Sequence, residues 1–580
     1  MKQFFKITFA CILGVFIAGF IGSLLFIFGI ISMADMSTPT YSPSKKSVFK
    51  LKLNTTVTER VQIQPLDEIM NTLSKETSPL GLNDILSAID KAQQNKHIAG
   101  IYLNTDGYTA SYPTTEAIRR RLEAFKESGK FIIAYNNHYS QNQYYLCSVA
   151  DSIFLNPVGS LNLTGLITQN VFFKNALEKL GVEMQIFRVG TFKSAIEPFI
   201  LNKMSEANRE QTETYLHSMW HTILSDISRS RNLSVDSLNA ITNEGTGFMT
   251  AENVLKTGLI SGLKYQSDIL PLLKQITNDD DIATPDLAKV KSMKSYKKEY
   301  KDQIAVLYAV GEITDSKSDG IYWEETVKEI EEIKKDESVK AVVFRVNSPG
   351  GSAFASEQIW EAISSLKKEK PVVVSMGTYA ASGGYYISCN ADYIIAEPTT
   401  LTGSIGVFGM IPNASDLLTN KIGLTFDEVK TNKFGNITFT QPMTELEKQL
   451  LQRSVEDIYT LFMQRCADGR GLPVDSIAKI AEGRVWSGTN ALQIGLVDEL
   501  GGMQTAIEKA ASLAEVEKYS VATYPISKDF FETLMSEFTE DATVRISRHI
   551  LGEDFKHLQV LKYVRSLSPI QARMEDVIVQ

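Results

Sequence analysis

Histidine and cysteine are scarce in this chain of 580 residues, and their positions exclude several kinds of site. The four cysteines show no paired, metal-like spacing, so the sequence predicts neither a metal centre nor a bound cofactor. One of them, Cys11, lies in the apolar N-terminal run, and the odd set that remains argues against a disulfide framework. No histidine lies between residues 300 and 548, and none of the six stands in a recognisable catalytic motif. A Ser-His-Asp triad is therefore not indicated, although such triads are assembled in space.

The chain also lacks a basic stripe. Its net charge is −9 at pH 7, and no basic segment is interleaved with aromatic residues, so we expect no nucleic-acid partner. Hydrophobic residues make up 43% and charged residues 22% of the chain, which is ordinary for a globular protein. Its length exceeds what one hydrophobic core usually holds, so two or more domains are expected.

Only the N-terminus carries a long apolar run. No charged residue occurs from Ile7 to Ala34, and a run of this length can span a bilayer with some tilt. We predict an uncleaved membrane anchor over about residues 7–34, within an anchor and stalk that comprise residues 1–46. A cleaved signal peptide ending near residues 32–34 is the alternative, but the run is longer than a typical signal-peptide core. Lysines occur on both sides and leave the orientation open: Lys2, Lys6, Lys45, Lys46, Lys50 and Lys52.

The rest of the sequence is written twice. A shift of 241 places residues 131–135 on 372–376 and residues 100–103 on 341–344, with matching apolar patterns. The same shift superimposes the pair Tyr144-Tyr145 on the pair Tyr385-Tyr386. A repeat of this length indicates two copies of one domain fold rather than a solenoid.

Each copy alternates short β-rich runs with amphipathic helical segments, which predicts an α/β fold with a parallel sheet. We place the first repeat at residues 47–270 and the second at residues 303–510. A polar, lysine-rich connector at residues 271–302 joins them. Residues 511–580 have a helical pattern and are predicted to form a C-terminal helical extension to which the sequence assigns no role.

The two copies differ in their chemistry. In the second copy, Ser382 and Gly383 follow a strand-like apolar run and precede an apolar helix, a context that exposes a reactive hydroxyl. A second glycine-rich turn at residues 347–351 ends in Gly351. The first copy has Gln141 where the second has Ser382, so only the second copy keeps a candidate nucleophile. On its own, the motif is equally typical of a plain glycine-rich turn.

A lysine can replace histidine as the base if burial lowers its pKa towards neutrality. The candidate is Lys193, which stands among apolar residues in the segment 190–199 of the first copy. Aligning residues 180–181 with 422–423 puts Gly435 opposite Lys193, so only the first copy would supply the base. Pattern alone favours a surface lysine at this position.

Four segments together resemble the long, protease IV type of the signal peptide peptidase A family. These are the Lys193 segment, the Ser382 segment, residues 347–352 and residues 401–407, and the likeness extends over about residues 1–510. The resemblance implies two tandem ClpP/crotonase-like domains, each a ββα spiral, and a serine peptidase whose Ser-Lys dyad is divided between them. It implies that Ser382 is the nucleophile and Lys193 the general base, and that Ser404 orients the lysine. Backbone N–H groups of Gly351 and Gly383 would hold the oxyanion.

The resemblance also implies a substrate and a location. We expect degradation of cleaved signal peptides and similar apolar peptides by a homotetramer, shaped like a bowl. We expect it to be held by a single span in the inner membrane, with its catalytic body on the periplasmic side. Two other functions remain open from the residues: a crotonase-like acyl-CoA enzyme, and a non-catalytic oligomeric membrane scaffold.

Overall fold

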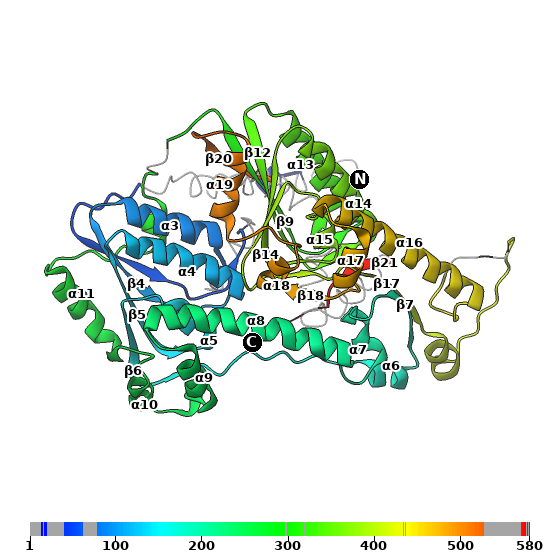
Figure 1. The fold of residues 1–580 in the computed structure, drawn as a ribbon, viewed down its shortest axis with the longest axis horizontal. Helices are drawn as coiled ribbons and strands as arrows, with labels where there is room; N and C mark the ends of the chain where they lie inside the picture. The colour runs from blue at the N-terminus through cyan, green and yellow to red at the C-terminus, as the bar shows by residue number, and fades with distance from the viewer. Residues whose placement is uncertain are drawn as a thin grey trace.

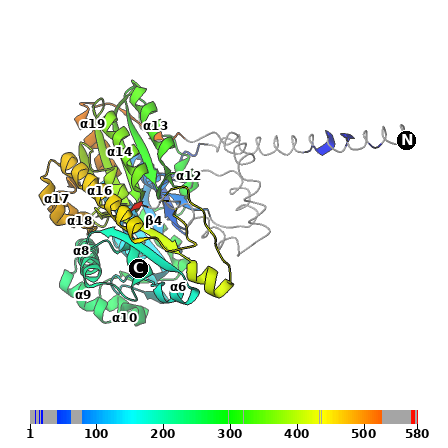
Figure 2. The same cartoon turned by 90° about the vertical axis from the view of Figure 1, so that its right-hand side faces the viewer.

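The fold is described here from a computed structural model (Figures 1 and 2). It describes residues 8, 13, 14, 17–19, 22, 40–61, 78–295, 298–317, 320–432, 434, 437–526, 570–575, 577 and 579. The predicted membrane span falls almost entirely outside these residues. Among the residues that are described, no helix has the length and apolar character needed to cross a membrane.

A five-stranded parallel sheet forms the centre of the first repeat, in the order β1-β4-β5-β6-β8. Its strands are buried and apolar along much of their length because helices cover the sheet. The strands are β1 (Ser47–Lys52), β4 (Ile98–Asn104), β5 (Phe131–Tyr139), β6 (Ser152–Leu161) and β8 (Gly262–Leu263), with a separate pair β2 (Val57–Thr58) and β3 (Leu80–Gly81). The helices are α3 (Leu82–Gln94), α4 (Tyr112–Glu127), α5 (Gln141–Cys147), α6 (Lys174–Leu180), α7 (Glu197–Ile200), α8 (Glu206–Arg231), α9 (Val235–Asn243), α10 (Ala251–Lys256), α11 (Ile269–Thr277) and α12 (Leu287–Lys291).

The second repeat is built on a larger sheet in the order β18-β16-β14-β12-β9-β20, with β15 and β19 branching from β14. Its strands are β9 (Gln303–Val310), β12 (Val339–Ser348), β14 (Val372–Ala381), β15 (Tyr393–Ala396), β16 (Leu401–Gly403), β18 (Val485–Ser487), β19 (Glu499–Leu500) and β20 (Ser520–Tyr524). Its helices are α13 (Trp323–Lys335), α14 (Ala353–Lys367), α15 (Gly383–Tyr386), α16 (Glu445–Arg470), α17 (Val474–Ile480), α18 (Gly488–Gln493) and α19 (Met503–Leu513).

The two copies have matching elements, so the predicted α/β fold and its internal repeat are confirmed. Adding 241 to the bounds of α3 gives those of α13, and the same shift carries β4 onto β12 and β5 onto β14 within three residues. The long helices α8 and α16 also correspond. Figure 1 shows the first copy at the left and the second at the upper right, with α8 running beneath both. Figure 2 shows α13, α14 and α19 at one end of the body and α9 and α10 at the other.

A third sheet joins the two repeats. Its order is β11 (Ile321–Tyr322), β10 (Ile313–Thr314), β13 (Gly350–Ser352), β21 (Ile570–Arg573), β17 (Val407–Asn413) and β7 (Glu183–Val189). Strand β7 comes from the first repeat, and it pairs antiparallel with β17 of the second over seven residue pairs, from Val189↔Val407 to Glu183↔Asn413. The segment that follows β7 is thereby directed into the second repeat.

The C-terminal extension departs from the helical expectation wherever it is described. After α19, residues 520–524 form β20, which adds a parallel edge strand to β9. Residues 570–573 form β21, which lies inside the third sheet. Residues 527–569 lie outside the described part. The prediction of helix was wrong for these two segments, because pairing with strands distant in sequence overrides local propensity.

A buried ion pair ties the repeats together near the carboxyl ends of the strands. Glu59, just after β2, accepts two hydrogen bonds from the Arg345 guanidinium on β12, at 2.7 and 3.1 Å. Both side chains are about 95% or more buried. Asn347 Nδ2 donates to the same carboxylate at 3.3 Å and its Oδ1 accepts from the Tyr379 N–H, so the pair also supports the chain beside Ser382.

We predict that Glu59→Ala lowers the free energy of unfolding by about 3–5 kcal/mol, because the Arg345 charge is left buried without its partner. Urea titration followed by tryptophan fluorescence measures the loss. The double variant Glu59→Leu/Arg345→Met is the control, and it regains most of the stability because neither charge remains buried. A Glu59→Ala protein as stable as the wild type would contradict this role.

Candidate active site

Ser382 lies between β14 and α15, at the point predicted from the sequence. Its backbone has φ 56° and ψ −115°, a conformation that costs an ordinary residue about 1–3 kcal/mol and is typical of functional sites. The Ser382 N–H donates to the Gly403 carbonyl at 2.8 Å, which helps to hold this turn. The serine is fully buried, and its Oγ donates to the Gly406 carbonyl at 3.4 Å.

Lys193 reaches Ser382 from the other repeat. It follows β7 by four residues, and its Nζ lies 2.8 Å from Ser382 Oγ. The lysine is 1% exposed, so it is not the surface residue that its sequence pattern favoured. The structure therefore brings the two predicted residues together although they are 189 positions apart.

Burial sets the chemistry of this lysine. Removal of water from the ammonium lowers the pKa of Lys193 from 10.5 to about 7, and the carboxylate of Glu575 acts in the opposite direction. A lysine with a pKa near 7 is partly neutral at physiological pH. Its amine can accept a proton from a hydroxyl that lies 2.8 Å away.

Ser404 also contacts Lys193. Its Oγ lies 3.1 Å and its carbonyl oxygen 3.3 Å from Nζ, so two acceptors fix the direction of the amine. Ser404 has φ 50° and is 1% exposed. This is the position expected of a residue that orients the lysine.

The two glycine-rich turns adjoin one another. A Cβ added to Gly350 would come within 2.7 Å of the Gly383 nitrogen, so β13 passes directly beside the residue after Ser382. Gly351 has φ 156°, and a Cβ there would approach the Ile313 carbonyl to 2.0 Å. Side chains are excluded at both turns, which leaves backbone N–H groups available next to the serine.

Three residues that position the lysine were not identified from the sequence. Gly406 and Gly483 pack against the Lys193 side chain, where added Cβ atoms would approach its Cδ to 3.3 Å and its Cβ to 2.7 Å. Gln211 on α8 donates to the carbonyl of Phe192 and accepts from the Val485 N–H, which ties the lysine segment to β18. In the sequence, Glu482-Gly483 matches Glu244-Gly245 of the first repeat at a shift of 238, and this match alone indicates no role.

In the first repeat, Gln141 takes the place of Ser382 and fills its site. Its Oε1 accepts from the N–H groups of Thr164 and Gly165 at 3.1 and 2.9 Å, and its Nε2 donates to the Tyr112 hydroxyl. Gly165 corresponds to Gly406 by the shift of 241. The Gln141 amide therefore provides hydrogen-bond partners for the first-repeat segment that corresponds to the one around Ser382 and Lys193. No nucleophile is present at this position.

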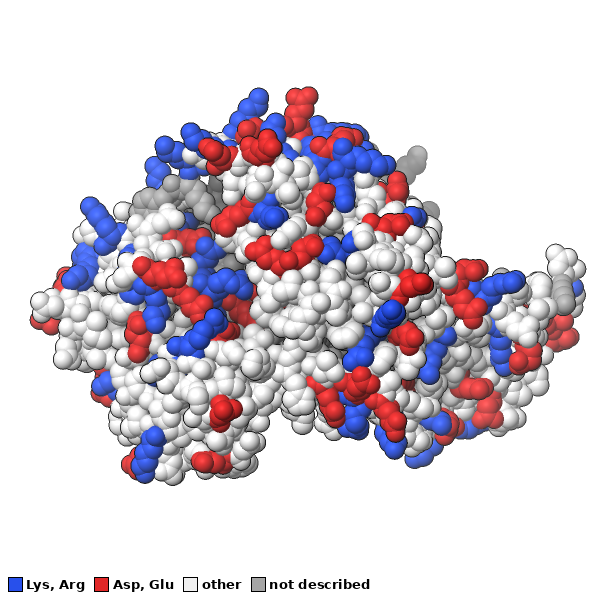
Figure 3. Space-filling model, in the orientation of Figure 1, with Lys and Arg blue, Asp and Glu red and all other residues white. Residues whose placement is uncertain are grey.

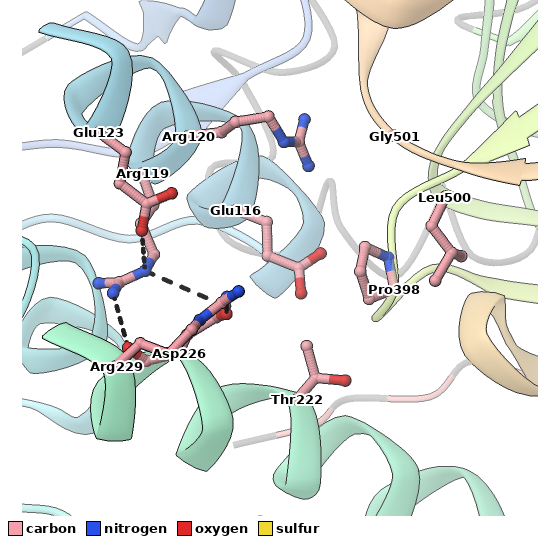
Figure 4. A pocket seen from close by; sticks show the side chains of 10 residues that line it. All are labelled: Glu116, Arg119, Arg120, Glu123, Thr222, Asp226, Arg229, Pro398, Leu500 and Gly501. Carbon is pink, nitrogen blue, oxygen red and sulfur yellow. Dashed lines mark hydrogen bonds and ion pairs between the residues drawn. The ribbon is translucent and has the colours of Figure 1, made fainter. Parts of the chain in front are cut away.

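Charged side chains of both signs alternate over the face seen in Figure 3, and some become buried where the repeats meet. Figure 4 shows a cavity of about 190 Å³ lined by α4, α8 and the chain near Pro398. Burial, and next the Glu397 carboxylate, raise the pKa of Glu116 well above its usual value. Glu397 forms an ion pair with Arg120. The Arg120–Glu397 ion pair joins α4 to the second repeat, and the cavity is lined by neither serine nor cysteine.

A buried serine hydroxyl in contact with a desolvated lysine amine, beside clustered backbone N–H groups, defines the site of a serine hydrolase. The sequence profile of peptidase family S49 matches this chain twice, at residues 124–278 and 364–517. The chain belongs to peptidase family S49. It is therefore a serine peptidase that acts on peptide substrates, and neither the acyl-CoA enzyme nor the non-catalytic scaffold is its function.

Relatives of known name agree with this assignment. Protease 4 of Haemophilus influenzae is 33% identical over 96% of this chain and 92% of its own length. The chloroplastic serine protease SPPA of Arabidopsis thaliana is 31% identical over 87% of this chain and 76% of its own. Among solved structures, a mutant of ClpP1 from Listeria monocytogenes matches 35% of this chain and 94% of that one, at 16% identity and a TM-score of 0.25.

We predict that Ser404→Ala lowers kcat about 2–10-fold with little change in KM. The variant loses the Ser404 hydroxyl, one of the two acceptors that Ser404 presents to Lys193 Nζ. Such a hydrogen bond contributes about 0.5–1.5 kcal/mol. Steady-state kinetics on a fluorogenic peptide measures the change. Thr402→Val is the matched control, because the Thr402 hydroxyl donates to the Ala380 carbonyl instead. A change confined to KM would contradict an orienting role.

Proposed function

We propose that this protein is a membrane-anchored endopeptidase that uses Ser382 and Lys193 as its dyad to degrade cleaved signal peptides and similar apolar peptides. The observation that supports the dyad is the 2.8 Å contact between Lys193 Nζ and Ser382 Oγ. Both side chains are buried away from water.

The reaction proceeds by acyl transfer. Neutral Lys193 takes the proton of Ser382 while Oγ forms a bond to the scissile carbonyl carbon. The resulting ammonium then donates a proton to the departing amine as the C–N bond breaks. Water enters, gives up a proton to Lys193, and cleaves the ester, which returns the hydroxyl to Ser382. Ser404 keeps Nζ directed at Oγ throughout.

The oxyanion is held by backbone N–H groups of Gly351 and Gly383. Gly383 directly follows Ser382, and Gly350, which precedes Gly351, adjoins the Gly383 nitrogen; this placement and the lack of side chains support the role. A donor of this kind lowers the activation barrier by about 2.7–4 kcal/mol in other serine peptidases.

The remaining parts of the proposal concern substrate, fold family and assembly. An extended apolar peptide pairs with exposed strand edges through its backbone, which suits the remnants of signal peptides. We propose that each repeat is a ClpP/crotonase-like ββα spiral, and that four chains form a bowl. The apolar segment at residues 7–34 supports anchoring by one span in the inner membrane, with the body on the periplasmic side.

We predict that Ser382→Ala lowers kcat about 10⁴–10⁶-fold and leaves the fold intact, because only one oxygen atom is removed. Lys193→Met has nearly the same effect, since a thioether cannot accept the proton. Hydrolysis of synthetic signal peptides, followed by mass spectrometry, measures both. Lys203→Met, at an exposed lysine ten positions away, is the control and keeps full activity. Wild-type turnover by Lys193→Met would eliminate the dyad.

The lowered pKa of Lys193 predicts an acid limb in the pH profile. The base must be neutral, so kcat/KM rises with pH, reaches half its maximum near the pKa of about 7, and levels off above it. At two pH units below this value, activity is about 100-fold lower. Initial rates between pH 5 and 9 test the prediction, and equal rates at pH 5.5 and 8.5 would show that another group is the base.

A further inference from the structure

The C-terminal strand of the chain lies inside the catalytic groove. β21 is antiparallel to β13 on one side and to β17 on the other. On the first side, Gly350, Gly351 and Ser352 face Arg573, Ala572 and Gln571, and the Met574 N–H donates to the Pro349 carbonyl at 2.8 Å. Addition of a strand to a sheet edge is a common way for an extended peptide to bind.

The strand crosses the groove at the catalytic residues. The Ala572 carbonyl oxygen would lie 2.1 Å from a Cβ added to Gly350 and 3.0 Å from one added to Gly383. It therefore occupies the neighbourhood of the glycine N–H groups. Ser382 is fully buried and Lys193 is 1% exposed. No peptide bond of another molecule can reach Ser382 while β21 is in place.

Several side chains hold this segment. Ala572, Met574 and Val577 are buried in the hydrophobic interior. Arg573 forms an ion pair with Glu312, next to β10, at 3.2 Å. Glu575 is 8% exposed and lies near Lys193, and its carboxylate hydrogen-bonds to Ser194 and Asn208. The contacts are spread over the described tail residues, as expected of a bound peptide rather than of a loose end.

Beyond the groove, the tail reaches a cavity beside Gln141, the first-repeat counterpart of Ser382. Val577 and Val579 line a cavity of about 560 Å³ together with Gln141 and Asn142, which correspond to Ser382 and Gly383. The Tyr379 hydroxyl donates to the Val577 carbonyl at 2.6 Å, at the boundary between the two sites. We call this cavity the first-repeat pocket.

We propose that the first-repeat pocket is a peptide-binding site that continues the catalytic groove, and that the described tail residues 570–575, 577 and 579 act as a tethered inhibitor that occupies the groove and borders the pocket. An extended peptide bound in the same direction places its C-terminal side in the pocket, five and seven residues beyond the one at Gly383. Val577 and Val579 give the pocket an apolar wall where it meets the tail, so we expect this part of the site to accept apolar side chains. The inhibitory part rests on the proposed function, since it presumes that Ser382 is the nucleophile.

Because the tail belongs to the same chain, a free peptide must compete with an occupant at a fixed effective concentration. Removal of residues 570–580 therefore opens the groove. We expect the rate constant for labelling of Ser382 by a fluorophosphonate probe to rise at least tenfold in this deletion variant. An unchanged rate would overturn the tail as an occupant.

A charge reversal tests the same point in the full chain, should the deletion variant fail to fold. Arg573→Glu places two carboxylates together and should raise the labelling rate about threefold or more, and so should Glu312→Arg. The double variant Glu312→Arg/Arg573→Glu restores the pair and the wild-type rate. Labelling that stays at the wild-type rate in both single variants would overturn the proposal.

Direct binding tests the pocket without catalysis. A labelled synthetic peptide with the sequence of residues 570–580 is titrated into the deletion variant that also carries Ser382→Ala, and anisotropy gives Kd. Replacing Val577 and Val579 of the peptide by Asp should weaken binding at least tenfold, whereas replacing both by Leu should not. Equal affinities of the Asp and Leu peptides would overturn the pocket.

A change in the protein provides the matched test. Tyr379→Phe removes the hydrogen bond to the Val577 carbonyl, so it should weaken the 570–580 peptide about threefold to tenfold and leave a peptide ending at residue 575 unaffected. Equal weakening of both peptides would overturn the predicted path. If no variant is labelled at Ser382 while the peptide still binds as expected, the proposed function fails and the peptide site stands.

Discussion

The site depends on one non-local interaction, the antiparallel pairing of β7 with β17. These strands come from different repeats, and their seven residue pairs end at Val189 and Val407. Lys193 follows Val189 by four residues, and Gly406 directly precedes Val407. A displacement of β7 by one residue would turn every side chain to the other face of the sheet. The distance of 2.8 Å between amine and hydroxyl therefore follows from the register of a single strand pair. Gln211, Gly406 and Gly483 refine a position that this pairing already determines.

In the proposed dyad, the first repeat has no serine and the second has no lysine at the corresponding positions. Each repeat must remain stably folded without the missing residue. The first repeat keeps the turn at β5 and α5, but Gln141 satisfies the neighbouring N–H groups of Thr164 and Gly165 with its amide. A buried polar group left without a partner costs about 1–3 kcal/mol, so the substitution preserves stability after the serine is gone. The cavity beside Gln141 persists, and Val577 and Val579 of the tail form part of its wall. The first repeat thus retains a binding surface where the second retains chemistry.

Much of this arrangement was predictable from the sequence. The shift of 241 gave matching helices and strands because both copies keep their apolar periodicity. The glycines around Ser382 indicated the turn on which the serine lies, but the expected exposure of its hydroxyl was wrong, because Ser382 is fully buried. Lys193 was identified through the likeness to a family, since its local pattern alone favoured a surface position. The β7–β17 pairing could not be derived, because the two strands are more than 200 residues apart and periodicity does not name a partner. The same holds for β21, whose local helical pattern was overridden by pairing on both sides.

Burial links the base to whatever occupies the groove. Lys193 has its pKa near 7 because water is excluded, and part of that exclusion comes from the tail that covers Ser382. The tail also brings Glu575 close to the amine, where its negative charge favours the ammonium and raises the pKa of the lysine. A substrate that displaces the tail keeps water out but need not bring a carboxylate to this position. An occupant without a carboxylate at this position therefore favours the neutral amine more than the tail does. If Ser382 and Lys193 are the proposed nucleophile and base, the tail that covers the one also weakens the other.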